Sequence, residues 1–562
     1  MSEVSKLFVR EHGKRWPLFT VMVLLSLLVT ALAFVTPYVY KTIIDVVIPH
    51  RDVRQLVLLI AIMVLTQLVY PVVNVLHSVI VSKGSMASVN AIRRHLFVCS
   101  GELSLGTVQR SGVGQVAARL KDDTNQYAGF LVGALNQLVA MTFNLVLAIG
   151  LMAMVNVRLM MVTVPVVLML GVISIWLRRP VTDAERAVRE TDSGLLRFLT
   201  DAMGGLRSIR ALGAQEEAAG MLDVEHRAYA TARNNSACWS GFSNSLSGLV
   251  LSLPYPAVLG YGSYLVLRGE MSIGGIVMFL IVIGRLFGPL VAMSSLWFAY
   301  ASALAPLRRL EELFEEPLRA SVRPPCSTPM PGGDLRLEGV RFSWEDGGVA
   351  ILADWLLRSG ATHGLQGPSG SGKSTLLNVM AGLERPQGGR MALGASSFDE
   401  VDPRRWRRTV TVVGAPHFLL PISIKENLKL AQPDASDEML HRVLSIVEAD
   451  EFVARYPEGI EHILDQGVGS ISTGEAARLA IARALLMSPR VLLLDEVTAS
   501  LSQDLERRVL ERIRAAFGRM TIVIATHRLQ TMELVDDVMV LENGGLRPGS
   551  TEPSRMASAV AV

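Results

Sequence analysis

The sequence predicts a multidomain membrane protein, in which an all-α domain of six membrane helices precedes an α/β P-loop domain. Long uncharged apolar runs fill the first 305 residues, and 50% of the whole chain is hydrophobic, which is high for a soluble protein. From residue 334 the pattern changes to short apolar strands that alternate with amphipathic helices. A complete phosphate-binding motif lies at the start of that second pattern.

Charge and cysteine usage exclude several classes of protein. The 54 Lys and Arg residues nearly balance the 51 Asp and Glu residues, so the formal net charge of +3 does not indicate a nucleic-acid partner. Cys99, Cys238 and Cys326 are far apart and lack the spacing of a metal site, so we expect free thiols.

The chain begins with a short amphipathic segment. Residues 2–15 place apolar side chains at helical spacing among basic residues, which predicts a helix on the inner membrane face and a cytosolic N-terminus. Trp16 to Tyr40 then contains no charged residue and is long enough to cross the bilayer, so it is the first predicted span.

Further spans follow the same criterion. The apolar runs are Gln55 to Ser82, Tyr127 to Val157, Leu159 to Leu177, Asn234 to Leu267, and Ile273 to about Ala305. Two long polar excursions separate the second span from the third and the fourth from the fifth. An even number of spans predicts that both termini are cytosolic, with lipid around the helices.

Two polar side chains interrupt the apolar runs. Arg285 lies deep in the sixth span, where a charge is costly unless it faces a wet cavity or a partner. It is therefore a candidate for the substrate pathway, and pairing with a neighbouring helix or snorkelling is the equal alternative. His77 in the second span carries a weaker form of the same argument.

Proline punctuation divides the chain into domains. Four prolines between residues 324 and 331 mark a linker. We predict a membrane domain over residues 1–317, a linker over 318–333, a nucleotide-binding domain over 334–546 and a mobile tail over 547–562.

The phosphate-binding motif runs from Gly367 to Thr375 and matches G-x-x-x-x-G-K-[ST] in full. Its glycines let the backbone N–H groups converge on anionic oxygens at the start of a helix. Lys373 is expected to reach the β- and γ-phosphates, and Ser374 to offer its hydroxyl to Mg²⁺. The predicted ATP contacts in this loop are Gly367, Ser369, Gly370, Ser371, Gly372, Lys373, Ser374 and Thr375.

Two later apolar runs complete the predicted site. Val491 to Asp495 reads as a strand buried on both faces that brings Asp495 to the metal and Glu496 to an attacking water. A second buried strand ends at His527, which is expected to contact the γ-phosphate. A lone histidine at a strand end is more often structural, so His527 gains weight only from its neighbours.

Six spans followed by a P-loop ATPase resemble a half-transporter of the ABC exporter family, and the resemblance covers nearly the whole chain. The stretch from Leu199 to Ala211 is similar to the second intracellular loop of that family. The stretch from Asp334 to Trp344 is similar to the start of its nucleotide-binding domain. The resemblance implies that Trp344 stacks on adenine, although an ordinary core tryptophan is the alternative.

In this family each ATP lies between the cradle of one chain and the signature motif of the other, normally Leu-Ser-Gly-Gly-Gln. The matching segment here is Ile471, Ser472, Thr473, Gly474 and Glu475. Thr473 adds a branched side chain where glycine allows close approach, and Glu475 adds negative charge near the phosphate. Both changes are expected to weaken the face offered to the partner's ATP.

Two more positions depart from the family pattern. Ala415 stands where the family has a glutamine that contacts metal and water, and Ser502 where it usually has aspartate. An intact cradle beside a degenerate signature resembles one half of an asymmetric heterodimer, with the intact signature on a different subunit. Ala415 and Ser502 leave open how fast even that site turns over.

The resemblance therefore implies ATP-driven export across a bacterial inner membrane, with ATP and Mg²⁺ as cofactors. A homodimer with two slow sites, a mainly regulatory ATP-binding subunit and an importer of the same architecture remain as alternatives. A soluble P-loop ATPase is excluded by the predicted spans. The apolar helices suit lipids, drugs or hydrophobic peptides as substrate, and Arg285 weakly favours an anionic or amphipathic one.

Overall fold

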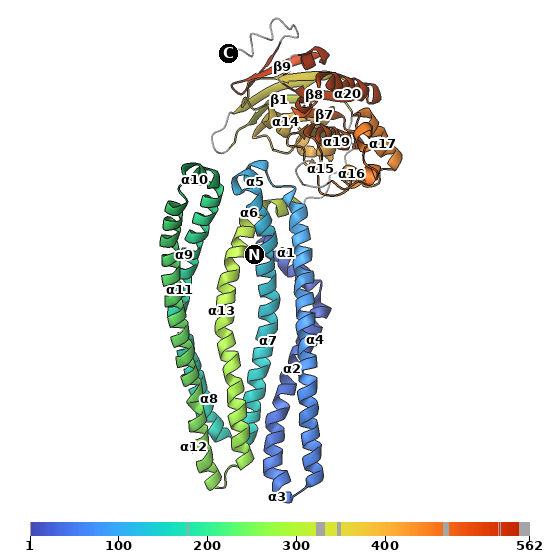
Figure 1. The fold of residues 1–562 in the computed structure, drawn as a ribbon. Helices are drawn as coiled ribbons and strands as arrows, with labels where there is room; N and C mark the ends of the chain where they lie inside the picture. The colour runs from blue at the N-terminus through green and yellow to red at the C-terminus, as the bar shows by residue number, and fades with distance from the viewer. Residues whose placement is uncertain are drawn as a thin grey trace. The chain divides into compact units, whose positions relative to one another are not determined.

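The structure is a computed structural model that describes residues 2–176, 179–321, 332–344, 350–464, 471–526, 528 and 530–549. The chain divides into two compact units (Figure 1). We call residues 1–102 and 113–321 the helical unit, and residues 103–112 and 322–562 the sheet unit. The all-α and α/β classes predicted from the sequence are both confirmed.

Long helices make up the helical unit. They are α1 (Glu3–Gly13), α2 (Trp16–Thr42), α3 (Ile48–His50), α4 (Val53–Ser100), α6 (Val113–Ala118), α7 (Thr124–Val155), α8 (Val157–Trp176), α9 (Arg179–Gly204), α10 (Leu206–Leu212), α11 (Gln215–Ser252), α12 (Pro254–Leu267) and α13 (Ile273–Ser321). Single π-helical turns follow α2 and α6.

Within the described residues, three helical segments are long and apolar enough to cross a membrane, namely Trp16–His50, Val53–Ser100 and Val113–Val155. Val157–Met169 and Ile273–Pro289 are shorter apolar helices. The protein is therefore an integral membrane protein, and the further spans and the cytosolic position of the termini stay predictions.

Two helix boundaries differ from the expected ones. The turn between α7 and α8 is centred on Asn156, two residues before the expected Arg158. The Asn156 side chain accepts a hydrogen bond from the Leu159 N–H at 3.1 Å, and this bond caps the start of α8. Helix α13 also continues to Ser321 without a break at the expected end of the sixth span. The first residues of the predicted linker therefore extend α13, and residues 322–331 lie outside the described residues.

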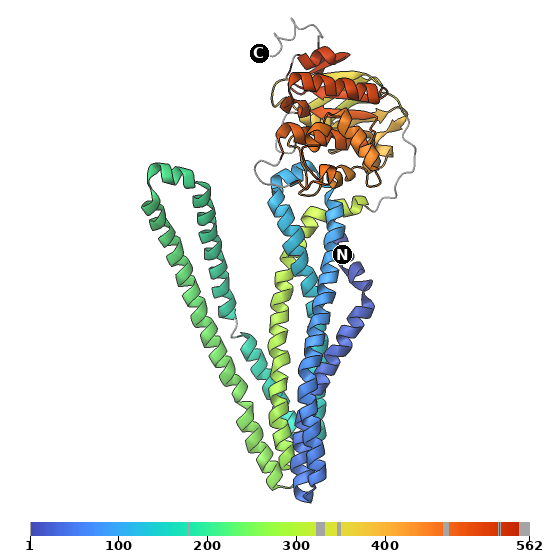
Figure 2. The same cartoon turned by 45° about the vertical axis from the view of Figure 1, so that its right-hand side comes forward.

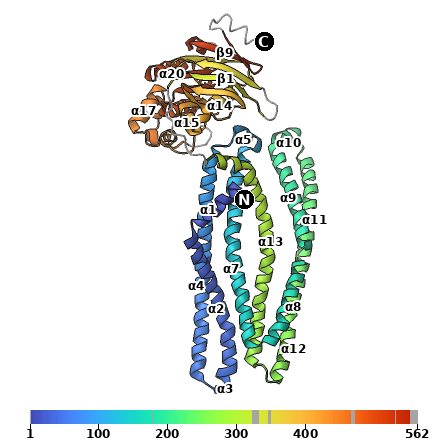
Figure 3. The same cartoon turned by 180° about the vertical axis from the view of Figure 1, so that it is seen from behind.

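Helix α13 is the central element of the helical unit, and it packs along α7 and α2 (Figures 1 and 3). Phe279, Val282 and Ile283 on α13 are fully buried in a hydrophobic cluster with residues of α2, α7, α8 and α12. The cluster surrounds the half of α13 that precedes Pro289, and further buried apolar residues, such as Leu310 and Phe314, lie towards the other end of the helix.

Helices α9 and α11 form a long hairpin closed by the short helix α10 (Figure 2). The two helices pack on each other along their length and diverge from α13 towards α10, as Figures 1 and 2 both show. Apolar side chains near α10, such as Met203, Leu206 and Leu212, are at least half exposed.

An ion pair joins α13 to the π-helical turn that precedes α7. The Arg309 guanidinium on α13 donates two hydrogen bonds to the Asp123 carboxylate, with N–O distances of 2.9 and 2.6 Å. Asp123 is buried and Arg309 is partly exposed. The Asp123 carboxylate raises the pKa of Arg309, so the charged pair is favoured in the folded protein.

We expect Asp123→Asn to lower the midpoint of thermal unfolding, because one charge-assisted bond is lost and Arg309 keeps a poorer acceptor. The cost should be about 1–3 kcal/mol before the exposure of Arg309 is discounted. Asp122→Asn is the matched control, since this neighbouring carboxylate is exposed and lies 3.8 Å from its Lys121 partner. Equal midpoints for the two variants would contradict the stabilising role of the pair.

The sheet unit contains one ten-stranded sheet in the order β5-β4-β1-β2-β10-β9-β3-β8-β7-β6. Its strands are β1 (Leu335–Phe342), β2 (Ile351–Leu357), β3 (Thr362–Gln366), β4 (Gly388–Leu393), β5 (Ser396–Ser397), β6 (Val410–Gly414), β7 (Val491–Asp495), β8 (Thr521–Ala525), β9 (Asp537–Glu542) and β10 (Gly545–Pro548). Strands β3, β8, β7 and β6 are parallel, so their carboxyl ends share one edge.

Helices cover the sheet and connect its parallel strands. Those of the sheet unit are α5 (Leu105–Ser111), α14 (Lys373–Met380), α15 (Pro403–Thr409), α16 (Ile424–Lys429), α17 (Asp437–Ile446), α18 (Asp450–Val453), α19 (Thr473–Leu486) and α20 (Gln503–Ala516). Helix α5 lies between α4 and α6 in sequence, yet it belongs to this unit.

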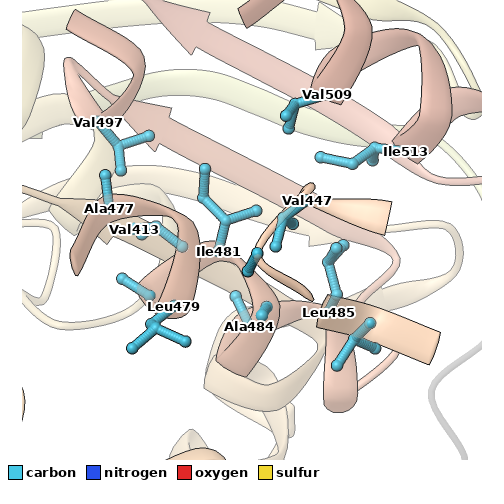
Figure 4. Close-up of a cluster of buried hydrophobic side chains, with 14 of the residues drawn as sticks. Val413, Val447, Ala477, Leu479, Ile481, Ala484, Leu485, Val497, Val509 and Ile513 are labelled. Carbon is cyan, nitrogen blue, oxygen red and sulfur yellow. The ribbon is translucent and has the colours of Figure 1, made fainter. Parts of the chain in front are cut away.

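Strand β7, which lies between β8 and β6 in the sheet, contributes to two hydrophobic cores. Leu492 and Leu494 face a cluster with α17, α19 and α20, part of which Figure 4 shows. Val491 and Leu493 face a second cluster that includes α14. Because alternate residues of a strand point to opposite faces, the four apolar residues bury β7 on both sides and fix where its carboxyl end lies.

Candidate functional site

The phosphate-binding loop lies between the buried strand β3 and the helix α14. Its glycines adopt backbone conformations that other residues rarely take, with φ of 154° at Gly367, 80° at Gly370 and 102° at Gly372. A Cβ on Gly367 would lie 2.4 Å from the Leu541 carbonyl oxygen. Glycine is therefore required at Gly367 both by the backbone angle and by the close approach of β9.

Lys373 is held inside this loop at the first turn of α14. Its ammonium donates to the carbonyl oxygens of Gly367 at 2.9 Å and Pro368 at 3.1 Å. Burial lowers the pKa of Lys373, and the charges of Glu496 and Asp495 oppose that shift. Ser371 is buried, and its hydroxyl has no hydrogen-bond partner within the described part of the chain.

Ser374 and Asp495 meet at the carboxyl edge of the sheet. The Ser374 hydroxyl donates to the Asp495 carboxylate, while burial of Asp495 raises its pKa against this bond. The Oδ1 atom of Asp495 is buried without a hydrogen-bond partner among the described residues. A buried carboxylate oxygen beside a hydroxyl is the hard oxygen donor set that Mg²⁺ prefers, so these residues fit that ion.

Glu496 follows Asp495 directly and is exposed. It has a left-handed backbone, with φ of 51°, and its N–H donates to the Ala525 carbonyl at the end of β8 at 3.0 Å. This bond fixes the turn that carries the Glu496 side chain beside the phosphate loop. His527, the expected γ-phosphate contact, lies outside the described residues.

Trp344 follows β1 and lies against the start of α14. Its indole N–H is 3.4 Å from the Thr375 hydroxyl oxygen, and its ring packs edge-on against Phe342 with centroids 5.0 Å apart. The ring is partly buried and packs against the hydrophobic cluster that includes α14, so the alternative of a core tryptophan stays open. Its role in stacking on adenine stays a prediction.

Ser472 caps the N-terminus of α19, and Glu475 completes a capping box. The Ser472 hydroxyl accepts from the Glu475 N–H at 3.3 Å, and the Glu475 carboxylate accepts from both the Ser472 N–H and its hydroxyl. Arg455 also pairs with Glu475. Burial alone would raise the pKa of Glu475, but the Ser472 and Arg455 bonds hold it below its ordinary value. The Glu475 carboxylate in the first turn of the helix is therefore ionised and paired with Arg455.

The remaining signature residues and Ser502 surround this cap. Thr473 is exposed in the first turn of α19, and a Cβ on Gly474 would lie 3.1 Å from the Ser500 carbonyl oxygen. Ile471 packs against the larger hydrophobic cluster. Ser502 begins α20 without a side-chain cap hydrogen bond.

Two family models match the chain. The ABC transporter transmembrane region matches residues 19–290, and the ABC transporter model matches residues 353–499. The chain belongs to the ABC transporter family. It is a transmembrane region fused to an ATP-binding domain, and it couples ATP hydrolysis to transport.

Curated relatives and a solved structure agree with this assignment. The chain is 25% identical over 537 residues to the toxin RTX-III translocation ATP-binding protein of Actinobacillus pleuropneumoniae, covering 94% of this chain and 74% of that one. It is 24% identical over 537 residues to the exotoxin translocation ATP-binding protein PaxB of Pasteurella aerogenes, with the same coverages. The structure of a bacterial Atm1-family ABC exporter with ATP bound is similar in fold, with a TM-score of 0.79, 20% identity, and coverage of 96% of this chain and 98% of that one.

In this ABC transporter the position after β6 lacks the amide group expected of the family. Gly414 pairs with Asp495 across the sheet, so Ala415 follows β6 at the edge where the site residues meet. The nearby His417 was not predicted from the sequence. It hydrogen-bonds to the Gly414 backbone, its Nδ1 atom has no partner in the described part of the chain, and burial lowers its pKa. No motif in the sequence identified this histidine in advance.

Glu506 and Arg528 were also not predicted. They form hydrogen bonds that connect the segments next to the site residues. The Arg528 guanidinium donates to Glu506 at 3.0 Å, and to the carbonyl oxygens of Leu501 and Ala499 at 2.8 and 2.6 Å. Glu506 is almost fully buried and also accepts from Thr531 at 3.0 Å. These bonds tie the segment after β8 to the turn that follows Glu496. An arginine directly after His527 was the available signal.

Helix α5 docks on the sheet unit next to Trp344. A Cβ on Gly106 would lie 2.8 Å from Cζ3 of Trp344, so the helix backbone lies against the indole ring. The buried Glu384 carboxylate accepts from the Leu105 N–H at 2.6 Å and also from the Gly106 N–H. Two N–H groups at the helix start therefore have an acidic partner, as the helix dipole favours.

Arg285 is half-buried in the helical unit. Its guanidinium lies 5.4 Å from the ring centroid of Phe34, and its Nε atom has no hydrogen-bond partner in the described residues. His77 contacts the Asn136 side chain at 3.2 Å, so its polar group is satisfied. The Nε donor of Arg285 is thus buried and unpaired among the described residues, whereas His77 is more simply explained as structural.

We expect Lys373→Ala to weaken ATP binding about tenfold or more, because charge-assisted bonds to phosphate contribute about 1.5–3 kcal/mol each. Asp495→Asn should remove most of the dependence of ATP affinity on Mg²⁺. Titration with a fluorescent ATP analogue, with and without Mg²⁺, measures both effects. Lys429→Ala on α16 is the control, and an equal loss in that variant would contradict the assignment.

Burial raises the pKa of Glu384, so its protonated form is the one that the fold favours. That stabilisation is present at low pH and is lost as the pH rises through the raised pKa. We expect Glu384→Gln, which imitates the protonated acid, to unfold at a higher temperature than the wild type at pH 8. The difference should vanish as the pH falls towards the raised pKa.

Glu384→Ala removes the acceptor altogether. It should speed hydrogen exchange of the Leu105 and Gly106 amides, measured by mass spectrometry on the full chain in lipid, while Glu384→Gln leaves these amides protected. Equal exchange in the two variants would show that Glu384 does not hold α5.

Proposed function

We propose that this chain is one half of a heterodimeric ABC exporter, whose partner supplies an intact signature motif. The observation that carries the proposal is the contrast between two faces of the same domain. The phosphate loop, Asp495 and Glu496 keep the groups needed for hydrolysis, whereas the α19 terminus begins with Thr473 and an ionised Glu475.

In this proposal Lys373 and the loop N–H groups bind the β- and γ-phosphates, and Ser374 with Asp495 holds Mg²⁺, which neutralises phosphate charge. Glu496 orients the attacking water, and His527 contacts the γ-phosphate. These roles follow the pattern of P-loop ATPases, in which catalysis depends on positioning and electrostatics.

The altered signature is unfavourable for the partner's ATP for two reasons. A helix N-terminus ordinarily attracts anions through its exposed N–H groups and dipole. Here the carboxylate of Glu475 already accepts from the Ser472 N–H and hydroxyl. A second negative charge, on the γ-phosphate, would be repelled at that position, and the Thr473 side chain would add bulk.

The α9–α10–α11 hairpin supports the need for a second subunit. Its tip exposes Met203, Leu206 and Leu212. Exposed apolar side chains that are grouped in one place indicate a contact surface. ABC transporters act as dimers, so we assign this tip to the contact with the partner. The altered signature motif, with Thr473 and Glu475, is the reason to propose that this partner is a different subunit.

Three rival functions remain. A homodimer with two slow sites requires that Thr473 and Glu475 be tolerated, and a mainly regulatory subunit is favoured by Ala415, which has no polar group to hold metal or water. An importer of the same fold would share every feature of the nucleotide site.

The substrate proposal rests on Arg285. A half-buried guanidinium with an available Nε donor, next to an aromatic ring, suits an anionic or amphipathic substrate. The relatives named as toxin translocators make an apolar peptide a second candidate. Lipids and drugs are further candidates from the apolar helices.

The deciding experiment measures Mg²⁺-dependent ATP turnover of the chain purified alone in lipid, with Glu496→Gln as the blank. We expect no turnover above this blank in folded protein that binds ATP. The double variant Thr473→Gly/Glu475→Gln keeps the capping geometry and removes the charge, so two copies should then hydrolyse ATP at about ten times the rate of the blank or more.

The control is Glu475→Asp, which retains the charge and should stay inactive. Turnover by the unmodified chain that disappears in Glu496→Gln would overturn the heterodimer in favour of a homodimer. In a complex with an isolated partner, ATPase activity that is unaffected by Glu496→Gln would make this chain the regulatory subunit.

A further inference from the structure

A groove of about 630 Å³ lies at the start of the first membrane helix, between α1, α2 and α7. Its lining is almost entirely apolar and includes Val9, Trp16, Leu24 and Leu135. These four side chains are between 50 and 68% exposed. The groove is therefore an open apolar surface beside the start of the first apolar helix, and its size is in the range of ligand sites.

One polar group of the groove lacks a partner. The Nδ1 atom of His12 is 2.7 Å from the Phe8 carbonyl oxygen, which fixes a proton on that nitrogen. The Nε2 atom is buried and has no hydrogen-bond partner among the described residues, while the ring stacks on Phe19. Neutral His12 thus offers an acceptor that is best satisfied by a hydroxyl group.

The rim of the groove is positively charged. Lys6 and Lys14 on this segment pair with Glu3 and Glu11, respectively. Arg10 and Arg15 have no ion pair in the part of the chain that the structure describes. Arg15 donates a long hydrogen bond to the Glu11 carbonyl oxygen at 3.4 Å, and Arg10 and Arg15 are neighbours in sequence of the lining residues Val9 and Trp16. Guanidinium groups beside an apolar groove complement an anionic head group attached to acyl chains.

We propose that this groove binds one anionic phospholipid of the phosphatidylglycerol type. An acyl chain lies along Val9, Trp16 and Leu135, and the phosphate lies near Arg10 and Arg15. A glycerol hydroxyl donates to Nε2 of His12. The lipid thereby fixes α1 on the first membrane helix, which neither ATP binding nor transport direction requires.

Gly13 provides a precise way to block the groove. It lies in the groove lining, and a Cβ at this position meets no atom within 4 Å, so a larger side chain fits without strain. Gly13→Phe should fill the groove, and helix stability should not suffer, because glycine is a poor helix former. Gly150→Phe on α7 is the matched control, since its Cβ is equally unobstructed and it lies outside the lining.

The test is native mass spectrometry of the full chain released from nanodiscs that contain phosphatidylglycerol and phosphatidylcholine in equal amounts. We expect one phosphatidylglycerol per chain, retained about tenfold more than phosphatidylcholine, in the wild type and in Gly150→Phe. Retention should be lost in Gly13→Phe. The double variant Arg10→Gln/Arg15→Gln should lose the preference for the anionic lipid, whereas Arg54→Gln at the start of α4 should keep it.

Equal retention of the two lipids by the wild type would overturn the proposal, and so would unchanged retention in Gly13→Phe. If Gly13→Phe does not fold, Val9→Trp replaces it as the blocking variant, because Val9 is an exposed lining residue on α1. Unchanged retention in a folded Val9→Trp chain would overturn the proposal in the same way.

Discussion

The hydrogen bond between Ser374 and Asp495 is the contact on which the nucleotide site depends. It joins the helix that follows the phosphate loop to the end of β7, and both groups reach it only because β3 and β7 run parallel in one sheet. Two hydrophobic cores hold β7 in place from opposite faces. Apolar contacts in the sheet unit therefore do more than stabilise its fold, because they also position the few polar atoms of the nucleotide site.

The parts of the site that the sequence predicted correctly are short and local. The phosphate loop requires glycine at fixed backbone angles, and a run of four apolar residues before Asp495 is typical of a strand buried on both faces. Each of these constraints acts within a few residues, so it is written in the sequence directly. The same holds for α1: its amphipathic spacing and basic residues predicted a helix within residues 2–15, and the helix runs from Glu3 to Gly13.

Contacts between distant residues could not be predicted in this way. Glu384 reaches α5 across 279 positions, and the bond that Glu506 accepts from Arg528 spans 22. His417 is distinguished by a buried ring nitrogen without a hydrogen-bond partner among the described residues, which the sequence alone does not show. The capping box is an intermediate case. The spacing of Ser472 and Glu475 is typical of a capping box, but both residues were interpreted from the sequence only as parts of the signature motif. The extension of α13 past Pro306 and Pro317 shows that packing can override a local helix-breaking signal.

Gly106 and Trp344 are packed so closely that neither residue can be substituted without affecting the other. The indole ring is in contact range of α5 on one side and of Thr375 on the other. A substitution that enlarges position 106 must displace the ring, and a smaller residue at position 344 must leave α5 without its support. Substitutions at these two positions would therefore be correlated in evolution, and a change at one would select for a compensating change at the other.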